Sequence, residues 1–343
     1  MKTPSFAKAR KKGLRQLSKR AKIAVGVILS IVLICNLCAF FIGYMMFNII
    51  IDTESDFSPR NINTTIYNLS RPFSRIEPTD AKPDAGPWFY GKSENVYIDS
   101  FDGLRLHGYH VQNGEQSANG NYVILVHGYG ADGRYMTDFA EHFYQKGYSL
   151  LSPDLRANGQ SEGRYIGMGW LDRWDLIGWI NFITQKSPTA KIVLFGISMG
   201  GAAVMNTTGE ELPDNVVAAI EDSGFSDTFD EIERLSWNGY HFPPLPFLFI
   251  SSVVSEVKAG FSFKDARCLT QLQKSKTPTL FIHGTDDAVV PYYMLEQNYN
   301  ACAAEKEKLS VDGAGHIRSV ETDRQLYWNT VDAFLEKYVK EGK

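Results

Sequence analysis

Cysteine is scarce in this sequence of 343 residues, which contains only four. Cys35 and Cys38 lie inside a long apolar run, where we expect them to pack as small hydrophobic residues. Cys268 and Cys302 are a pair that an oxidising compartment would allow to join, but two cysteines do not make a disulfide framework. No CxxC–His arrangement is present, so neither structural zinc nor any other metal is expected.

Basic residues are also scarce over most of the chain. Nine of the 35 lysines and arginines fall within residues 1–22, which contain no acidic residue. The rest of the chain therefore holds 26 basic and 39 acidic residues, a formal charge of −13. Binding to nucleic acid requires clustered lysine and arginine against the phosphates, so nucleic acid is not an expected partner.

Charge is absent altogether from residues 23–51, a run of 29 residues. At ~1.5 Å per residue, a helix of this length exceeds the ~30 Å hydrocarbon core of a bilayer. A cleaved signal peptide would have an apolar core of only ~7–15 residues that ends in small residues. This run instead continues through Phe40, Phe41 and Tyr44, so residues 23–51 are predicted to be a retained transmembrane anchor.

The charges on either side of the run predict its orientation. Basic residues precede it, whereas Asp52, Glu54 and Asp56 follow it. The positive-inside rule then places the N-terminus in the cytoplasm and the rest of the chain after the run outside the cell membrane, as a single-pass protein. The predicted organisation is a basic tail over residues 1–22, the anchor over 23–51, a polar and proline-containing connector over 52–91, and one domain over 92–343.

Strand-like and helix-like segments alternate through that domain. A hairpin is predicted around Asp102-Gly103, because apolar residues alternate on both sides of this turn. Further strands are predicted over residues 122–126, 149–152, 192–195, 216–220, 279–282 and 309–311. Helices are predicted over residues 136–146, 170–184, 198–208, 292–301 and 321–338. This pattern is typical of an α/β fold with a mostly parallel central sheet and helices on both faces.

A serine follows one of these strands in the segment Gly196-Ile197-Ser198-Met199-Gly200, which fits G-x-S-x-G. The pentapeptide alone is a weak signal, but it lies directly between an apolar strand and a helix-compatible run. In that context Gly196 and Gly200 allow a very tight turn that exposes the serine hydroxyl. Ser198 is therefore predicted to be a catalytic nucleophile rather than an N-capping serine.

A serine nucleophile needs a base, and the base needs an acid that fixes its tautomer. Of the seven histidines, His316 follows the last predicted strand in the glycine-containing loop Asp312-Gly-Ala-Gly-His, which is able to carry an imidazole back over the sheet. The acid should lie between Ser198 and His316 in chain order, just beyond a strand end. Asp286 and Asp287 both satisfy this condition, and the residues alone leave the choice open.

Two backbone N–H groups should stabilise the oxyanion of the reaction. Met199, the residue after the nucleophile, is the first candidate. The second is Tyr129, which stands between two glycines in Val126-His127-Gly128-Tyr129-Gly130 after the first central strand. His127 and Gly128 are expected to support this loop.

In chain order, these motifs resemble the α/β-hydrolase superfamily, and more closely the membrane-anchored cell-surface α/β hydrolases of Gram-positive bacteria. The resemblance spans about residues 94–340 and rests on Val123-Ile-Leu-Val-His-Gly-Tyr-Gly, Pro153-Asp-Leu-Arg-Ala-Asn-Gly-Gln-Ser, Gly196-Ile-Ser-Met-Gly-Gly, His283-Gly-Thr-Asp-Asp-Ala-Val-Val-Pro and Gly313-Ala-Gly-His. It implies an α/β-hydrolase fold with a lid insertion, here residues 225–266.

The resemblance also bears on individual residues. The family pattern H-G-x-x-D-x-x-V-P places the catalytic acid at Asp287, with Asp286 as the second choice. One departure is visible, because Ala157 and Asn158 stand where the family pattern D-x-R-G-H-G-x-S has glycine and histidine. This difference puts the local geometry of the loop in question, not the Ser198, Asp287 and His316 triad.

Three functions remain open on the sequence. The first is a serine hydrolase that cleaves small-molecule or lipid-like carboxylic esters without a cofactor. The second is a serine peptidase of the aminopeptidase or prolyl-oligopeptidase kind, for which Glu221 or Asp222 would recognise a substrate amine. The third is a non-catalytic surface binding protein. The aromatic and proline-rich lid is either a cap that packs on its own core or an apolar cover over an acyl-binding pocket.

Overall fold

The computed structural model describes residues 19–56, 87–114, 120–239 and 241–340. Most of the predicted basic tail and residues 57–86 of the predicted connector lie outside the described residues. The strands are β1 (Glu94–Asp99), β2 (Arg105–Val111), β3 (Asn121–Val126), β4 (Ser149–Pro153), β5 (Lys191–Ile197), β6 (Val216–Asp222), β7 (Thr279–Gly284) and β8 (Lys306–Val311). The α-helices are α1 (Lys19–Ile50), α4 (Pro87–Lys92), α5 (Thr137–Gln145), α6 (Asp172–Lys186), α7 (Met199–Thr208), α8 (Thr228–Arg234), α9 (Phe247–Ala259), α10 (Cys268–Leu272), α11 (Tyr293–Ala301), α12 (Ser319–Thr322) and α13 (Arg324–Leu335).

The strands form one eight-stranded sheet in the order β1-β2-β4-β3-β5-β6-β7-β8. β1 and β2 are the predicted antiparallel hairpin, and β2 pairs antiparallel with β4. All remaining neighbours are parallel. The α/β class and the mostly parallel sheet are therefore as the sequence predicted. Because β3 to β8 run in one direction, the loops that follow them gather at a single edge.

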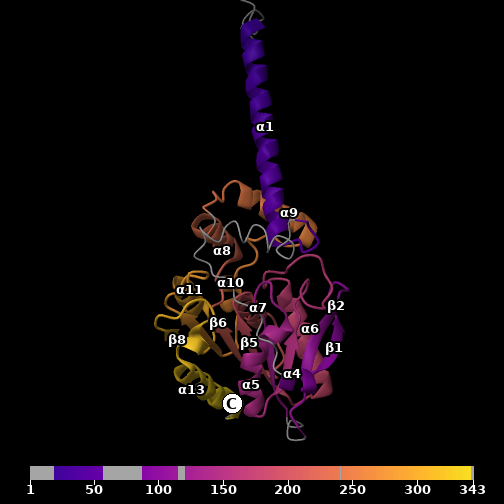
Figure 1. Cartoon of the computed structure of the whole chain (residues 1–343), viewed down its shortest axis with the longest axis vertical. Coiled ribbons are helices and arrows are strands. Elements are labelled where there is room, and N and C mark those ends of the chain that lie inside the picture. The colour runs from indigo at the N-terminus through magenta and orange to yellow at the C-terminus, as the bar shows by residue number, and fades with distance from the viewer. Residues whose placement is uncertain (1–18, 57–86, 115–119, 240, 341–343) are drawn as a thin grey trace, which may run out of the picture.

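Helices cover both faces of the sheet (Figure 1). Successive residues of a strand point to opposite faces, so Val123 and Leu125 of β3 join the core that α5 and α13 cover. Ile124 and Val126 join the other core, together with residues of α6, α7 and α9. Both faces are apolar because each must pack against a helix layer, which explains the continuous apolar runs that predicted the strands.

An insertion that contains α8 and α9 separates β6 from β7. Its two ends are tied at the base, where the Arg267 guanidinium lies 2.7 Å from the Asp227 carboxylate. The Thr228 N–H also donates to the Ala266 carbonyl at 3.0 Å. Inside the insertion, Leu248 and Phe263 are fully buried and belong to the same core as α6 and α7. The insertion therefore packs on the body rather than on a separate core of its own.

The first helix is the one described helix that is long and apolar enough to cross a membrane. It extends away from the body, and its root lies beside α9, at the end of the molecule opposite the C-terminus (Figure 1). Its last turns are packed into the body, because Phe47 is fully buried and Ile51 follows it into the core. Asp52, the first residue of the predicted connector, is buried and paired with Arg164 at 2.8 Å.

The four cysteines are all free. Cys268 and Cys302 are both buried, and they do not form the disulfide that the sequence allowed. Cys268 instead packs in the core, where its thiol donates to the Ala202 carbonyl at a sulfur–oxygen distance of 3.6 Å.

Candidate active site

Ser198 stands on a sharp turn between β5 and α7. Its φ of 53° and ψ of −122° lie in a region that non-glycine residues rarely adopt. The two flanking glycines are required by close backbone approach. A Cβ on Gly196 would lie 2.2 Å from the Gly200 carbonyl oxygen, and one on Gly200 would lie 2.1 Å from the Val126 carbonyl oxygen. The pattern around Ser198 thus has a steric cause at both glycines.

Three residues far apart in the sequence meet at this turn. His316 Nε2 lies 2.9 Å from Ser198 Oγ, and His316 Nδ1 lies 2.8 Å from Asp287 Oδ2. In this geometry the Nδ1–H donates to the carboxylate, which leaves Nε2 free to accept the serine proton. The structure therefore brings together the three residues that the sequence predicted to act as nucleophile, base and acid.

Asp287 is held by hydrogen bonds to both of its carboxylate oxygens. Oδ1 accepts from the N–H groups of Val289 and Val290, each at 2.8 Å. Burial on its own would raise the pKa of this carboxyl, but hydrogen bonds from His283 and His316 lower the pKa to about 2. Asp287 is thus ionised near neutral pH and oriented toward His316.

The two neighbouring aspartates differ clearly in position. Asp287 is buried beside His316, whereas Asp286 is exposed and its N–H donates to the Ala314 carbonyl at 3.0 Å. Of the two aspartates that the residues alone left open, only Asp287 contacts His316.

His283, to which no sequence motif assigns a role, lies beside Asp287. It is fully buried, and its Nε2 lies 3.2 Å from Asp287 Oδ2 and 2.9 Å from the Val290 carbonyl oxygen. Burial would lower the pKa of this imidazole, but the contact with Asp287 raises it. The sequence feature that could have pointed to His283 is its position near the end of β7, four residues before Asp287.

The loop after β3 lies directly against Ser198. A Cβ on Gly128 would lie 3.2 Å from the Ser198 Cβ and 3.7 Å from its Oγ. Tyr129, the predicted second oxyanion donor, follows at once, and its hydroxyl donates to the Ile50 carbonyl at 2.7 Å. Met199, the predicted first donor, begins α7, and the first N–H groups of a helix have no carbonyl partner within it.

His127 supports this loop from below. It is fully buried, its Nδ1–H donates to the Gly128 carbonyl at 2.8 Å, and its Nε2 accepts from the Leu155 N–H at 3.0 Å. Burial lowers the pKa of His127, so the ring is neutral and able to make both bonds at once. This geometry agrees with a supporting role rather than a role as base.

The loop that departs from the family pattern keeps a defined structure. Ala157 adopts a φ of 60°, a left-handed conformation that suits glycine better than alanine. The Asn158 side-chain amide donates to the Arg156 carbonyl at 2.9 Å. Asp154 holds the loop by accepting from the N–H groups of Gly133 and Gln160, each at 2.8 Å. Ala157 therefore adopts a strained conformation, and the loop is held by hydrogen bonds from Asn158 and to Asp154.

Glu221 and Asp222 do not face a substrate. Both are fully buried. Glu221 accepts from the Gly224 N–H at 2.8 Å, and Asp222 accepts from the hydroxyls of Ser223 and Tyr327 at 2.8 and 3.0 Å. Burial raises the pKa of Glu221 to about 8, so it is largely neutral at pH 7. The idea that these two residues recognise a substrate amine is therefore wrong.

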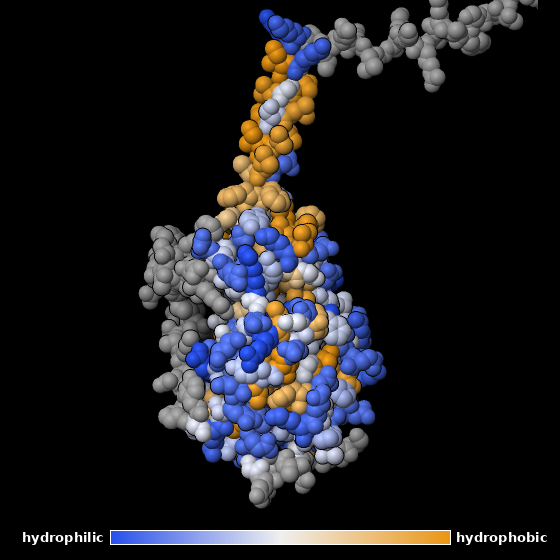
Figure 2. Space-filling model, turned by 90° about the vertical axis from the view of Figure 1, so that its right-hand side faces the viewer, coloured by the Kyte–Doolittle hydropathy of each residue, from blue (hydrophilic) through white to orange (hydrophobic). Residues whose placement is uncertain are grey.

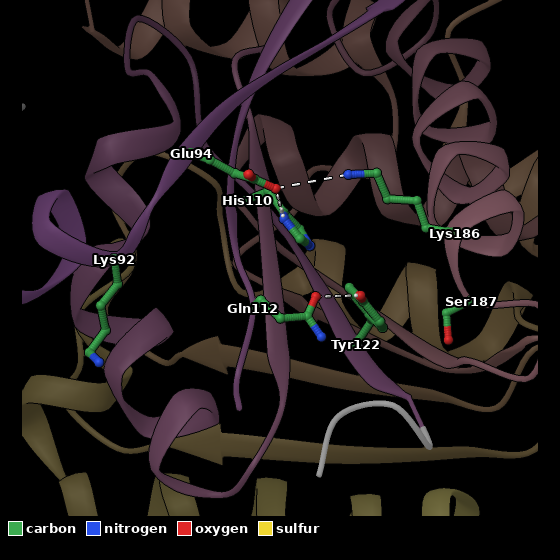
Figure 3. A pocket seen from close by; sticks show the side chains of 7 residues that line it. All are labelled: Lys92, Glu94, His110, Gln112, Tyr122, Lys186 and Ser187. Carbon is green, nitrogen blue, oxygen red and sulfur yellow. Dashed lines mark hydrogen bonds and ion pairs between the residues drawn. The ribbon is translucent and has the colours of Figure 1, made fainter. Parts of the chain in front are cut away.

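A surface cavity of about 480 Å³ lies elsewhere on the body, and it includes no residue of the triad. Figure 3 shows Glu94 between His110 and Lys186, at 2.7 and 3.9 Å. Tyr122, which also lines the cavity, lies at the amino end of β3. Since Ser198, Asp287 and His316 all follow carboxyl ends of strands, this cavity is not their substrate pocket.

Comparison with known proteins gives one family and several relatives. A family described as serine aminopeptidase, S33, matches residues 118–225. The uncharacterized protein YqkD of Bacillus subtilis (strain 168) is 26% identical over 243 residues, which cover 70% of this chain and 78% of the relative. The alpha/beta hydrolase domain-containing protein WAV2 of Arabidopsis thaliana is 25% identical over 261 residues, which cover 73% of this chain and 80% of the relative.

Among solved structures, the esterase Pf2001 of Pyrococcus furiosus is similar to this chain with a TM-score of 0.60 and 24% identity. The superposition covers 77% of this chain and 99% of the esterase. At this level of identity the likeness shows a shared fold, and the esterase activity in its name belongs to that protein.

Proposed function

Because the chain belongs to the α/β-hydrolase superfamily, we propose that it is a membrane-anchored serine hydrolase that cleaves carboxylic esters. The observation that carries this proposal is the position of His316, which contacts Ser198 Oγ through one ring nitrogen and Asp287 through the other. A non-catalytic binding protein would have no need for the backbone strain at Ser198.

The reaction proceeds through an acyl-enzyme. Ser198 Oγ attacks the ester carbonyl carbon while His316 Nε2 takes the serine proton. The tetrahedral intermediate then expels the alcohol, which leaves with the proton that His316 held. Water next attacks the acyl carbon with His316 as base, the acid is released, and Ser198 regains its proton. Asp287 keeps His316 in the tautomer whose Nε2 is able to accept a proton.

The N–H groups of Met199 and Tyr129 would stabilise the oxyanion in both halves of this reaction. The contact between Gly128 and Ser198 supports this role, because it brings the loop after β3 to the nucleophile. His127 holds the loop in place from beneath. Donors fixed in advance are worth about 3–4 kcal/mol each to such reactions.

Peptide cleavage is the second candidate, and the match to the serine aminopeptidase family favours it. An aminopeptidase needs an acidic group that faces the substrate amine. Glu221 and Asp222 do not supply it, because both are buried and hydrogen-bonded within the protein. The esterase among the structural neighbours supports the ester reading.

Membrane attachment through α1 is part of the same proposal. Its most apolar window is not buried by the rest of the protein, whereas its last turns pack into the body through Phe47 and the Asp52–Arg164 pair. Removal of α1 as a signal sequence would expose the surfaces that Phe47 and Ile51 cover. Retention as an anchor, with the basic N-terminus in the cytoplasm and the body outside, is therefore the reading that we adopt.

The proposal is tested on membranes that contain the full chain. A fluorophosphonate probe should label the wild type and should not label Ser198→Ala, and p-nitrophenyl esters should be cleaved faster than aminoacyl anilides. Equal labelling of both proteins would refute the serine mechanism. A preference for anilides over every ester would instead favour the peptidase.

A further inference from the structure

The helix α9 exposes three apolar side chains that follow one another at intervals of four residues. Phe249, Val253 and Val257, here called the α9 stripe, are 51%, 43% and 81% exposed. The opposite side of α9 is buried and includes Leu248. A helix that buries one face and leaves a second face apolar is suited to a second nonpolar environment.

The position of α1 indicates what that environment is. No residue of α1 before Gly43 is buried, and the 20 residues 23–42 would extend ~30 Å, the thickness of a hydrocarbon core. Burial begins at Gly43, where a Cβ would lie 2.6 Å from the Ile250 Cβ of α9. The contact between α1 and α9 therefore begins at the point where the helix would leave the hydrocarbon.

Residues 43–50 would extend only ~12 Å beyond that point, so the part of α9 that contacts them would lie within the thickness of a headgroup layer if residues 23–42 crossed the hydrocarbon. Two lysines and the exposed Glu256 lie beside the stripe. The exposed Lys258 lies beside α1, with its Nζ 3.1 Å from the Tyr44 hydroxyl. Lys264 Nζ lies 5.2 Å from the Phe249 ring centre. Ammonium groups next to exposed apolar side chains are typical of helices that rest on phospholipid. Figure 2 shows apolar residues along α1 and again where α1 meets the body.

The candidate active site lies at this same end of the body. The Tyr129 hydroxyl donates to the carbonyl of Ile50, the last residue of α1, at 2.7 Å. Gly128, the residue before Tyr129, is in contact with Ser198. A short chain of contacts therefore joins the end of the membrane helix to the proposed nucleophile.

From these positions we propose that the α9 stripe rests in the headgroup layer of the bilayer that α1 crosses, and that Ser198 acts on acyl esters carried in that bilayer. This inference rests on the span of α1 and the serine chemistry proposed above. It adds the surface that contacts the membrane and the class of substrate, an ester with a long acyl chain held among phospholipids.

The test uses the full chain in vesicles of phosphatidylcholine and phosphatidylglycerol, with the lipid-facing Cys35 and Cys38 replaced by alanine. A fluorescent NBD group is attached at Val257→Cys or, as a second position, at Phe249→Cys. The matched control is Leu326→Cys on α13, which is also exposed. Lipids with a nitroxide near the headgroup should quench the two α9 probes and leave the control unaffected, and aqueous iodide should do the reverse.

Quenching of the α9 probes by iodide as strongly as the control would overturn membrane contact. Protection from both quenchers would mean that protein covers the stripe, which also contradicts the proposal. Fluorophosphonate labelling of the same samples reports on Ser198 separately. Labelling with no lipid quenching would refute only the membrane surface, and quenching with no labelling would refute only the serine mechanism.

A kinetic comparison tests the substrate class. The double variant Val253→Asp with Val257→Asp should reduce hydrolysis of a long-chain monoacylglycerol in these vesicles, relative to hydrolysis of p-nitrophenyl acetate in water, on the order of ten-fold. The control Leu326→Asp should leave this ratio as it is in the wild type. An unchanged ratio in the double variant would show that the substrate does not arrive through the bilayer at this surface.

Discussion

The molecule contains two histidine–aspartate pairs in which the histidine Nδ1 lies at the same distance from the aspartate carboxylate. His316 Nδ1 lies 2.8 Å from Asp287, and His107 Nδ1 lies 2.8 Å from Asp154. Their second ring nitrogens differ. His316 Nε2 faces Ser198 Oγ at 2.9 Å, whereas His107 Nε2 faces the side-chain oxygen of Asn95 at the same distance.

Exposure separates the two pairs further. His107 is entirely buried, whereas the His316 side chain keeps 12% of its surface exposed. A carboxylate orients the imidazole in both cases, so this contact alone does not identify a catalytic histidine. The group at the second nitrogen and its access to substrate make the difference.

Replacement of His316 should have the largest effect on activity. His316→Ala removes the proposed base, so kcat for an ester should fall on the order of 10⁴- to 10⁶-fold. The unfolding temperature should fall only modestly, because the buried Asp287 carboxylate keeps its contacts with His283 and with the Val289 and Val290 N–H groups. Ester kinetics and thermal unfolding of the same preparation measure both. Retention of more than a few per cent of wild-type kcat would exclude His316 as the base.

Replacement of His107 should produce the reverse pattern. His107→Ala removes the imidazole from the buried Asp154 carboxylate, which keeps its hydrogen bonds from the Gly133 and Gln160 N–H groups. Leaving a buried polar group partly unsatisfied costs about 1–3 kcal/mol of unfolding free energy. Activity per folded molecule should stay within several-fold of the wild type. Denaturant unfolding measures the loss of stability, and ester kinetics with active-site titration measure the activity per folded molecule. A stable but inactive His107→Ala variant would show that His107 contributes to catalysis rather than to stability, which contradicts the difference proposed between the two pairs.

Asp287 should contribute to the free energy of unfolding by an amount that depends on pH. Its pKa in the fold is about 2, below the ordinary value of 3.8, a difference equivalent to about 2 kcal/mol. Because the pKa is lowered on folding, this contribution is fully present above pH 4 and disappears as the pH falls through 2. Asp287→Asn should therefore be less stable than the wild type at pH 6, and the difference should shrink toward pH 2. Denaturant titrations across this range would show a constant difference if the carboxylate charge were unimportant.

The smallest expected effect is at the contact between α1 and the candidate active site. Tyr129→Phe removes the hydroxyl that donates to Ile50, a bond worth about 1 kcal/mol. We expect kcat to fall by no more than about ten-fold with the backbone N–H still in place. The control is Tyr97→Phe, an exposed tyrosine on β1, which should match the wild type. An effect as large as that of His316→Ala would mean that the tyrosine hydroxyl itself takes part in the reaction.

The strands, the order of Ser198 and His316, and the tight turn were predictable because each depends on local sequence. Apolar runs predict buried strands. Gly196 and Gly200 predict the tight turn, because a side chain at either position would collide with the backbone. The choice between Asp286 and Asp287 is different, because the two residues are adjacent. It depends on which one the loop turns inward, and family resemblance rather than spacing pointed to Asp287.

Two features depend on tertiary packing and lay beyond the sequence. The contact of His283 with Asp287 exists only because the loop after β7 folds back over the strand end. The docking of α1 on α9 joins segments about two hundred residues apart, whereas the sequence predicted a connector from residue 52 onward. Gly43 was a hint in hindsight, since a glycine in an apolar helix permits the close approach to Ile250.

Mass spectrometry of the acyl-enzyme would locate the nucleophile of this protein. The wild-type protein is mixed with a p-nitrophenyl ester, quenched in acid within the turnover time, digested and sequenced. We predict one acyl group per molecule, attached to Ser198 on the peptide that links β5 to α7. An acyl group on any other residue, or turnover with no covalent intermediate and undiminished in Ser198→Ala, would contradict this prediction.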